Sequence, residues 1–160
     1  MVEIKEYEEK YAEEISKIII SNMYEINIKE HGKEVIDKLA KNFTTEEIIN
    51  RFPEREKVYV AIEDNKVLGT ASINKFRGDT TGNKYIILTV FVKIENHHQG
   101  IGKKLIKEIE KYAISIGAKE VIIPSSIYGC EFYRKLGFDY YNNDKSLNED
   151  KEYTLVKYYN

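Results

Sequence analysis

The stretch Val90-Phe91-Val92-Lys93-Ile94-Glu95-Asn96-His97-His98-Gln99-Gly100-Ile101-Gly102-Lys103-Lys104-Leu105 joins an apolar strand to a short polar loop and a glycine pair that opens an amphipathic helix. The N-terminus of a helix leaves backbone N–H groups without intrahelical partners and bears a partial positive charge. Glycines allow that backbone to approach a phosphate closely. The stretch therefore predicts an anion site suited to a pyrophosphate.

Three lysines, Lys103, Lys104 and Lys107, fall in the first turns of the predicted helix. Positive side chains are unfavourable at a helix N-terminus, because the helix dipole is also positive there. A bound polyanion would remove this penalty, so the lysines favour a phosphate ligand. The alternative is an ordinary solvated face, which is what most runs of charge form.

Two common phosphate-binding motifs do not fit. A P-loop needs a glycine five residues before its Gly-Lys pair and a Ser or Thr after the lysine, but His97 and Lys104 occupy those positions. The dinucleotide fingerprint needs a third glycine three residues after Gly102, where the chain has Leu105. The sequence therefore excludes both motifs.

The rest of the chain alternates between helical and strand periodicity. Strands are predicted at residues 2–4, 58–62, 67–73, 84–93, 121–123, 138–141 and 152–159, and helices at 11–26, 36–43, 44–52, 100–116 and 128–136. Gly32, Gly117 and Gly137 are the expected helix stops. The order places helices across a central sheet.

Two motifs make the chain resemble the GNAT N-acetyltransferase superfamily. The family's coenzyme A motif, Gln/Arg-x-x-Gly-x-Gly/Ala, matches residues 97–102 at both glycines, with His97 in the place of Gln or Arg. A second hallmark, Asn-x-x-Ala-x-x-Phe-Tyr-x-x-x-Gly-Phe, matches residues 126–138, with Ser126 and Gly129 in the places of Asn and Ala. The resemblance extends over essentially the full length.

This resemblance implies an α/β fold of mixed α+β type. The family fold has a central mixed, mostly antiparallel sheet that is splayed between its middle strands and flanked by about four to five helices. Residues 1–160 are expected to form a single acetyltransferase domain of this kind.

The resemblance also implies acetyl-CoA as co-substrate. The backbone around Phe91 and Val92 would pair with the pantetheine arm and supply hydrogen-bond donors to the developing oxyanion. The other expected cofactor-binding residues lie in the glycine loop, the helix after it and the second motif: His97, His98, Gln99, Gly100, Ile101, Gly102, Lys103, Lys104, Ser126 and Tyr133.

The reaction implied by the resemblance is direct attack of an uncharged amine on the thioester. Tyr133 matches the family tyrosine and is the candidate general acid for the leaving thiolate, with an aromatic core residue as the alternative. The general base is left unassigned, since Glu25, Glu30 and His31 are typical of exposed polar positions.

Composition excludes several classes of protein. The 25 Lys and Arg against 27 Asp and Glu leave a net charge of −2, which argues against nucleic-acid binding through a basic field. The single cysteine, Cys130, allows no internal disulfide, and it and three scattered histidines predict no metal site. The acidic start resembles no signal peptide, and no apolar stretch is long enough to span a bilayer, so a cytoplasmic protein is expected.

The sequence therefore predicts an acetyl-CoA-dependent N-acetyltransferase that acts on a primary amine of a small molecule or peptide. The alternative is a non-catalytic acyl-CoA-binding sensor or regulatory module, which the unassigned base and the departures at His97 and Ser126 keep open. A generic α/β domain without a cofactor is a third interpretation, and it requires both motifs to be coincidental. The acceptor, the acyl chain and the oligomeric state, including a homodimer, stay open.

Overall fold

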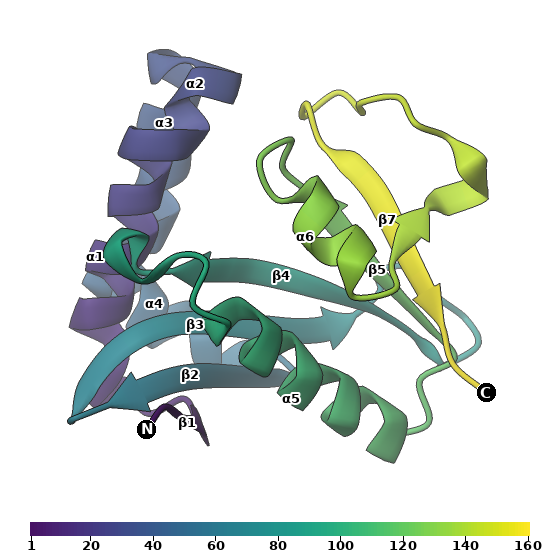
Figure 1. Ribbon diagram of the computed structural model, residues 1–160, viewed down its shortest axis with the longest axis horizontal. Coiled ribbons are helices and arrows are strands. Elements are labelled where there is room, and N and C mark those ends of the chain that lie inside the picture. The colour runs from purple at the N-terminus through teal and green to yellow at the C-terminus, as the bar shows by residue number, and fades with distance from the viewer.

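A seven-stranded sheet with the order β1-β2-β3-β4-β5-β7-β6 runs through the computed structural model, which describes residues 1–160 (Figure 1). All neighbouring strands pair antiparallel except β4 and β5, which are parallel. The predicted mixed, mostly antiparallel sheet is confirmed. The strands are β1 (Glu3–Glu6), β2 (Lys57–Glu63), β3 (Lys66–Lys75), β4 (Lys84–Val92), β5 (Glu120–Ser125), β6 (Asp139–Tyr140) and β7 (Tyr153–Tyr158).

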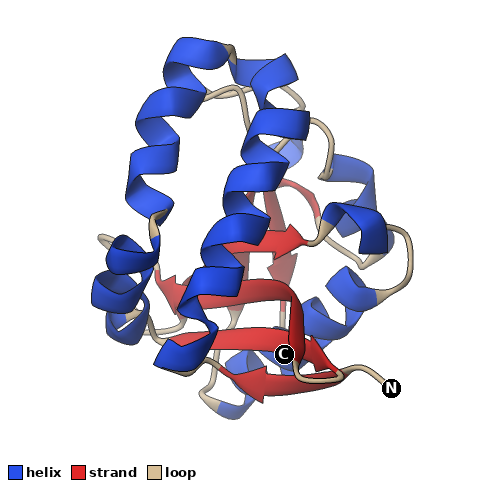
Figure 2. Ribbon diagram, turned by 90° about the vertical axis from the view of Figure 1, so that its left-hand side faces the viewer, coloured by secondary structure: helices blue, strands red, loops and turns tan.

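Helices cover both faces of the sheet, and the N-terminal ones stand in front of the strands in Figure 2. A π-helical segment, η2 (Met23–Asn27), joins α1 to α2, and Gly32 at φ +82° separates α2 from α3. None of the helices has the length and apolar composition needed to cross a membrane. The helices are α1 (Ala12–Asn22), α2 (Ile28–His31), α3 (Lys33–Ala40), α4 (Thr45–Arg51), α5 (Ile101–Ser115) and α6 (Cys130–Lys135).

Two hydrophobic cores lie on opposite faces of the sheet. The larger core packs α5 and α6 onto the sheet and includes Leu105, Ile109 and Phe138. The smaller core packs α1, α3 and α4 onto β2 and includes Ile15, Ile36 and Ile48. The period-3.6 apolar faces of these helices thus meet the alternating apolar residues of the strands, as the sequence predicts.

Most helix boundaries follow the predicted signals. Gly117 at φ +82° follows α5, Gly137 at φ +100° follows α6, and the Thr44 hydroxyl accepts from the Glu47 N–H at 3.2 Å to cap α4. Two helices differ from the prediction: α6 begins at Cys130 rather than at Tyr128, and α3 spans Lys33–Ala40 rather than residues 36–43. The residues before α6 form a turn, in which the Ser126 hydroxyl accepts from the Gly129 N–H at 3.0 Å.

The sheet opens between β4 and β5. These strands pair only over Lys84–Ile86 and Glu120–Ile122. Beyond that point β4 pairs only with β3, and β5 pairs only with β7. The two strands therefore diverge from a short closed end, and the gap between them widens toward Val92 and Ser125 (Figure 1).

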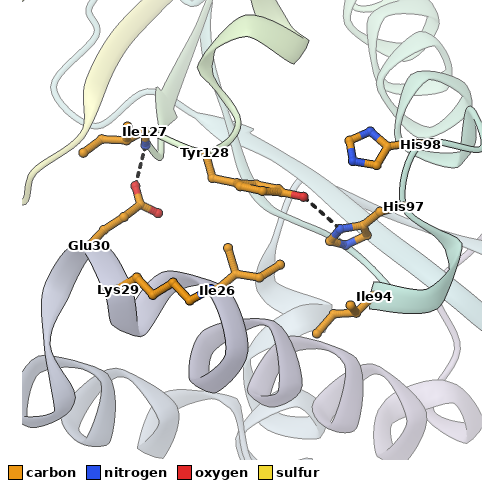
Figure 3. Close-up of a pocket in the computed structure, with 8 residues that line it drawn as sticks. All are labelled: Ile26, Lys29, Glu30, Ile94, His97, His98, Ile127 and Tyr128. Carbon is orange, nitrogen blue, oxygen red and sulfur yellow. Dashed lines mark hydrogen bonds between the residues drawn. The ribbon is translucent and has the colours of Figure 1, made fainter.

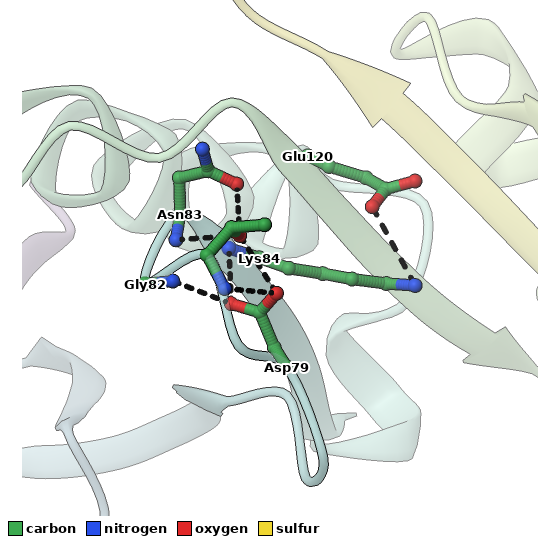
Figure 4. A network of polar contacts seen from close by, with 6 residues as sticks. Asp79, Gly82, Asn83, Lys84 and Glu120 are labelled. Atoms are coloured by element: carbon green, nitrogen blue, oxygen red, sulfur yellow. Dashed lines mark hydrogen bonds and ion pairs between the residues drawn. The ribbon is translucent and has the colours of Figure 1, made fainter.

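Polar contacts pin the closed end of this opening (Figure 4). The Asn83 carbonyl accepts from the Lys119 N–H at 2.8 Å, which ties the start of β5 to the start of β4. The half-buried Lys84 ammonium and Glu120 carboxylate, 3.5 Å apart, bridge the same two strands. In the loop before β4, the Asp79 carboxylate accepts from the N–H groups of Gly82 and Lys84, at 3.0 and 3.2 Å.

Helix α5 offers a matched test of the larger core. Ile109→Ala removes a fully buried side chain, and we expect unfolding free energy to fall by about 3 kcal/mol. For a domain of this size the midpoint would drop by about 6–12 °C. Ile114→Ala, at a side chain that is 59% exposed on the same helix, should change stability by less than about 0.5 kcal/mol. Equal midpoints by calorimetry would contradict this packing.

Candidate active site

A β-bulge in β4 decides which backbone groups face the opening. Thr70 pairs with Phe91, but Ser72 pairs with Leu88, so β4 has one extra residue opposite Ala71. Thr89, inside this bulge, has φ +57°. The bulge reverses the alternation of the strand, because Ile87 before it and Val90 and Val92 after it all pack on the α5 face.

The end of β4 beyond the bulge, residues 90–92, is called the open arm below. The Lys93 N–H donates to the Leu68 carbonyl at 2.7 Å, so Lys93 and Phe91 direct their backbone groups toward β3. Backbone direction alternates along a strand. The N–H and C=O groups of Val90 and Val92 therefore point into the opening, while the Phe91 side chain lies on the opposite face from α5.

A cavity of about 890 Å³ occupies the opening. Its floor is β4 from Ile87 to Val92, and its walls come from α1, η2 and α3 on one side and from β5 and α6 on the other. Ten of the residues predicted from the sequence line it: Phe91, Val92, His97, His98, Gly100, Ile101, Gly102, Lys103, Ser126 and Tyr133.

The N-terminus of α5 opens into this cavity. Gly100 is the N-cap in the left-handed conformation, at φ +83°, and no side chain caps the helix. The first intrahelical bond runs from the Lys104 N–H to the Gly100 carbonyl at 3.1 Å, which leaves the N–H groups of residues 101–103 without helical acceptors. A Cβ added at Gly100 would meet nothing within 4 Å, so the loop is open above these donors.

Two predicted residues lie outside the cavity lining. The Gln99 side chain folds back on the preceding turn, where its Nε2 donates to the Glu95 carbonyl at 3.3 Å. Lys104 is exposed on the first turn of α5, beside Lys103. Further along the helix Lys111 is paired with Glu108 at 3.9 Å. Of these three residues, only Lys103 lines the cavity.

A smaller pocket of about 480 Å³ adjoins the cavity, shares Ile26, His97, His98 and Tyr128 with it, and is called its mouth below (Figure 3). Polar contacts join the two walls there. The His97 Nε2 lies 2.7 Å from the Val92 carbonyl, and its Nδ1 lies 3.3 Å from the Tyr128 hydroxyl. A neutral imidazole protonated on Nε2 satisfies both contacts, donating to Val92 and accepting from Tyr128. His97 therefore links the open arm to the loop before α6.

The same Val92 carbonyl accepts from Asn22 Nδ2 at 2.9 Å, so α1 also holds the open arm. On the far side of the mouth, the Glu30 carboxylate accepts from the Ile127 N–H at 2.6 Å, while its other oxygen is buried without a partner. With its carbonyl occupied, Val92 offers its N–H to a ligand, and Val90 offers both backbone groups.

Tyr133 is buried in α6, with its ring against Phe132 at 5.1 Å and Phe138 at 6.4 Å. Burial raises the pKa of its phenol, which therefore stays protonated at neutral pH. Gly129 makes room for this ring, because an added Cβ would lie 3.3 Å from Tyr133 Cε2 and 3.2 Å from the Ser126 hydroxyl. Ser126 and Gly129, the two residues that differ from the family motif, thus contact each other, and Gly129 leaves room for the Tyr133 ring.

Two carboxylates line the cavity, Glu131 on α6 and Glu152 before β7. Burial raises the pKa of Glu152, and the charges of Asp150 and Glu30 raise it further. Neither carboxylate lies on β4. No three His, Cys, Asp or Glu side chains converge as a metal ion would require.

A comparison with protein-family models decides the identity. The model of the acetyltransferase (GNAT) family matches residues 20–138, which is more than half of the chain. The chain belongs to the acetyltransferase (GNAT) family. The matched range runs from within α1 to Phe138, just before β6, and contains the open arm, the glycine loop and Tyr133. No curated protein matches the sequence significantly.

Solved structures share the fold of this family member. PaiA N-acetyltransferase from Thermoplasma acidophilum, in complex with coenzyme A, superposes with a TM-score of 0.83 at 20% identity over 99% of each chain. A GNAT family acetyltransferase from Staphylococcus aureus Mu50 gives 0.75 at 17% identity, also over 99% of each chain. One from Brucella melitensis, in complex with acetyl-CoA, gives 0.68 at 21% identity over all of this chain and 89% of that one.

Several residues of the site were not predicted from the sequence. Asn22 occupies a helical position with apolar neighbours, and a polar residue on that face was the available signal. Thr89, Tyr128 and Glu30 gave no such signal, because their contacts join elements far apart in the chain.

The pH dependence of stability tests the burial of Tyr133. Its raised pKa means that the stability from this group is complete below about pH 10 and is lost as the pH rises further, since the unfolded phenol ionises first. From pH 9 to 11.5 the unfolding free energy of Tyr133→Phe should fall less steeply than that of the wild type, by up to about 1.4 kcal/mol per pH unit. The unfolding free energies are measured by urea denaturation at each pH. If they fell in parallel for the two proteins, the Tyr133 phenol would be an ordinary, solvated one.

Proposed function

We propose that this protein is an acetyl-CoA-dependent N-acetyltransferase that transfers an acetyl group to a primary amine of a small molecule or peptide. The supporting observation is one cavity that combines the open arm of β4, the uncapped N-terminus of α5 and the Tyr133 phenol. Each of these features answers a separate requirement of the reaction.

The residues present fit the phosphate-bearing half of coenzyme A. The free N–H groups of Ile101, Gly102 and Lys103, at the positive end of a 15-residue helix, would hold the pyrophosphate. The exposed Lys103 ammonium would add charge. Gly102 is packed tightly, since an added Cβ would lie 2.9 Å from Phe132 Cζ, so the backbone lies close to α6 at this point.

The open arm fits the pantetheine half. An extended amide chain can pair with the cleft-facing groups of Val90 and Val92 as an additional strand pairs with a sheet edge. The opening beside β4 provides that edge, because β5 has already diverged. A ligand bound there would replace the missing strand partner.

Bound acetyl-CoA would supply an activated acetyl group on a thioester. An uncharged amine would form the new C–N bond as the C–S bond breaks, with the thiolate as leaving group and the nitrogen proton lost to solvent. A backbone N–H of the open arm, fixed before the reaction, would donate to the carbonyl oxygen as negative charge grows on it. The Tyr133 phenol, kept neutral by burial, would give its proton to the leaving sulfur.

The amine would enter from the wall formed by α1, η2 and α3. Met23, Ile26 and Leu39 line this wall with apolar surface, together with Phe43 just after α3. Such a lining excludes water from the reacting centre and accepts the carbon chain of an amine. The cavity carboxylate Glu152 would be available to the ammonium form of the acceptor, whereas Glu131 is paired with Arg134 at 3.1 Å.

Ligand binding is the first test. Acetyl-CoA at 100 times its Kd should stabilise the fold by about 2.7 kcal/mol and raise the unfolding midpoint by about 5–11 °C. Gly100→Ala should weaken coenzyme A binding about tenfold or more, because loss of the left-handed N-cap misdirects donors to the phosphates. Calorimetric titration with coenzyme A measures this.

Gly78→Ala is the matched control. Gly78 has φ +86° and open space around a built Cβ, as Gly100 has, but it lies in the β3–β4 loop outside the cavity. Both variants should lose about 1–2 kcal/mol of stability, and only Gly100→Ala should lose affinity. If millimolar acetyl-CoA did not raise the unfolding midpoint of the wild type, the proposal would be refuted. Firm binding without thiol release from any of a broad amine panel would favour the sensor instead.

Tyr133→Phe tests the acid role. With an acceptor identified from the amine panel, we expect kcat to fall about 100-fold, while the KM for acetyl-CoA stays within about twofold. The measurement is thiol release under saturating acetyl-CoA, with the unfolding midpoint as a check on folding. Unchanged turnover would assign Tyr133 to packing alone.

A further inference from the structure

The bulge in β4 holds a residue in an unfavourable backbone conformation. Thr89 has φ +57°, a region that β-branched residues rarely adopt and that is strained for a residue other than glycine. Such a conformation persists only where surrounding contacts enforce it. The structure shows which contacts do so.

One guanidinium binds both strands at the bulge. Arg55 Nη1 donates to the Thr89 hydroxyl and to the Ser72 hydroxyl, each at 2.7 Å. The Ser72 hydroxyl in turn donates to the Leu88 carbonyl at 2.8 Å. Two consecutive residues of β4, Leu88 and Thr89, are therefore fixed to β3 through Arg55 and Ser72.

Arg55 is placed for this contact by its own surroundings. It follows a 3-10 turn, η4 (Phe52–Glu54), and its guanidinium lies over the buried Phe52 ring, 4.5 Å from the centroid. Arg55 makes no ion pair with a carboxylate, and burial lowers the pKa of its guanidinium to about 10. Burying a charged group without a counter-ion destabilises the folded state, unless hydrogen bonds to that group offset the cost of removing it from water.

The consequence of the bulge is the direction of the open arm. If the pairing of Ser72 with Leu88 continued without the extra residue, Thr70 would face Val90 instead of Phe91. Val90 would then direct its backbone toward β3, and Phe91 would direct its backbone into the cavity. The bulge therefore decides which amides a ligand in the cavity meets.

We propose that Arg55 is a positioning residue, which holds Thr89 in the left-handed conformation and thereby directs the backbone of Val90 and Val92 into the cofactor cavity. This inference rests on the proposed function, since its consequence is binding of coenzyme A along the open arm. Arg55 itself does not line the cavity, so it acts through Thr89, which does.

The test uses Arg55→Met, which keeps the length of the side chain and removes its donors. The first readout needs no ligand: the ¹³Cα and ¹³Cβ chemical shifts of Thr89 and the amide shifts of Val90 and Val92 report the backbone conformation. We expect Thr89 to leave the left-handed region. The second readout is calorimetric titration with coenzyme A well below the unfolding midpoint, in which we expect at least tenfold weaker binding.

A second substitution separates positioning from general stabilisation. Glycine adopts positive φ freely, so Thr89→Gly in the Arg55→Met background should recover at least fivefold of the lost affinity for coenzyme A. A structural role alone predicts no recovery, because the second substitution removes still more contacts. If Arg55→Met does not fold, Thr89→Val takes its place, since it removes the hydroxyl at constant shape and should weaken binding at least fivefold.

Arg77→Met is the control, at an exposed arginine in the β3–β4 loop, and should bind coenzyme A as the wild type does. The inference would be overturned if Arg55→Met kept the wild-type chemical shifts of Thr89 and the wild-type affinity for coenzyme A and only its unfolding midpoint fell. It would also be overturned if Thr89→Gly did not restore binding in the Arg55→Met background. Absence of coenzyme A binding by the wild type would refute the proposed function instead. The chemical shifts of Thr89 would still test whether Arg55 holds Thr89 in the left-handed conformation.

Discussion

The register shift at Thr89 is the constraint on which the site depends. Strand β4 has to pair with β3 along its whole length while offering a free edge beyond Ile86, where β5 diverges. One extra residue reverses the alternation, so that Val90 and Val92 pack on the α5 face and aim their backbone groups at the opening. Phe91 then faces the opposite core. Both cores thus reinforce the register that the bulge sets.

The opening is stable because each end of it is held by different contacts. At the closed end, the parallel pairing of β4 with β5 is short, and the Lys84–Glu120 pair and the Asn83 carbonyl reinforce it. At the wide end, backbone groups that lack a strand partner obtain one elsewhere, as the Val92 carbonyl does from Asn22 and His97. Buried backbone groups without partners are costly, so these contacts offset the cost of leaving the sheet incomplete.

Much of the fold could be predicted from local patterns. Helical and strand periodicity located the elements, and glycines at positive φ ended α5 and α6 where expected. The family motifs located the α5 N-terminus and Tyr133, because a glycine turn and an aromatic pair are contiguous in sequence. The start of α6 was misplaced by two residues, since the Ser126 cap forms a turn whose composition resembles that of a helix.

The contacts that shape the cavity were beyond the sequence alone. Arg55 lies 34 residues before Thr89, Asn22 lies 70 residues before Val92, and Glu30 lies 97 residues before Ile127. In the sequence Arg55 and Glu30 look like solvated polar positions, and only Asn22, a polar residue on an apolar helical face, gives a signal. Their roles arise only when the sheet brings distant segments into hydrogen-bonding distance.

The sequence by itself determined the class of fold, the family and the position of the glycine turn that opens α5, because each depends on residues adjacent in the chain. Only the tertiary structure decided which amides of β4 face the cavity. The run Tyr85–Val92 is apolar on both sides of Thr89, and an apolar strand has no alternation from which a register can be deduced. The register follows instead from a bulge whose anchoring side chain comes from another part of the chain.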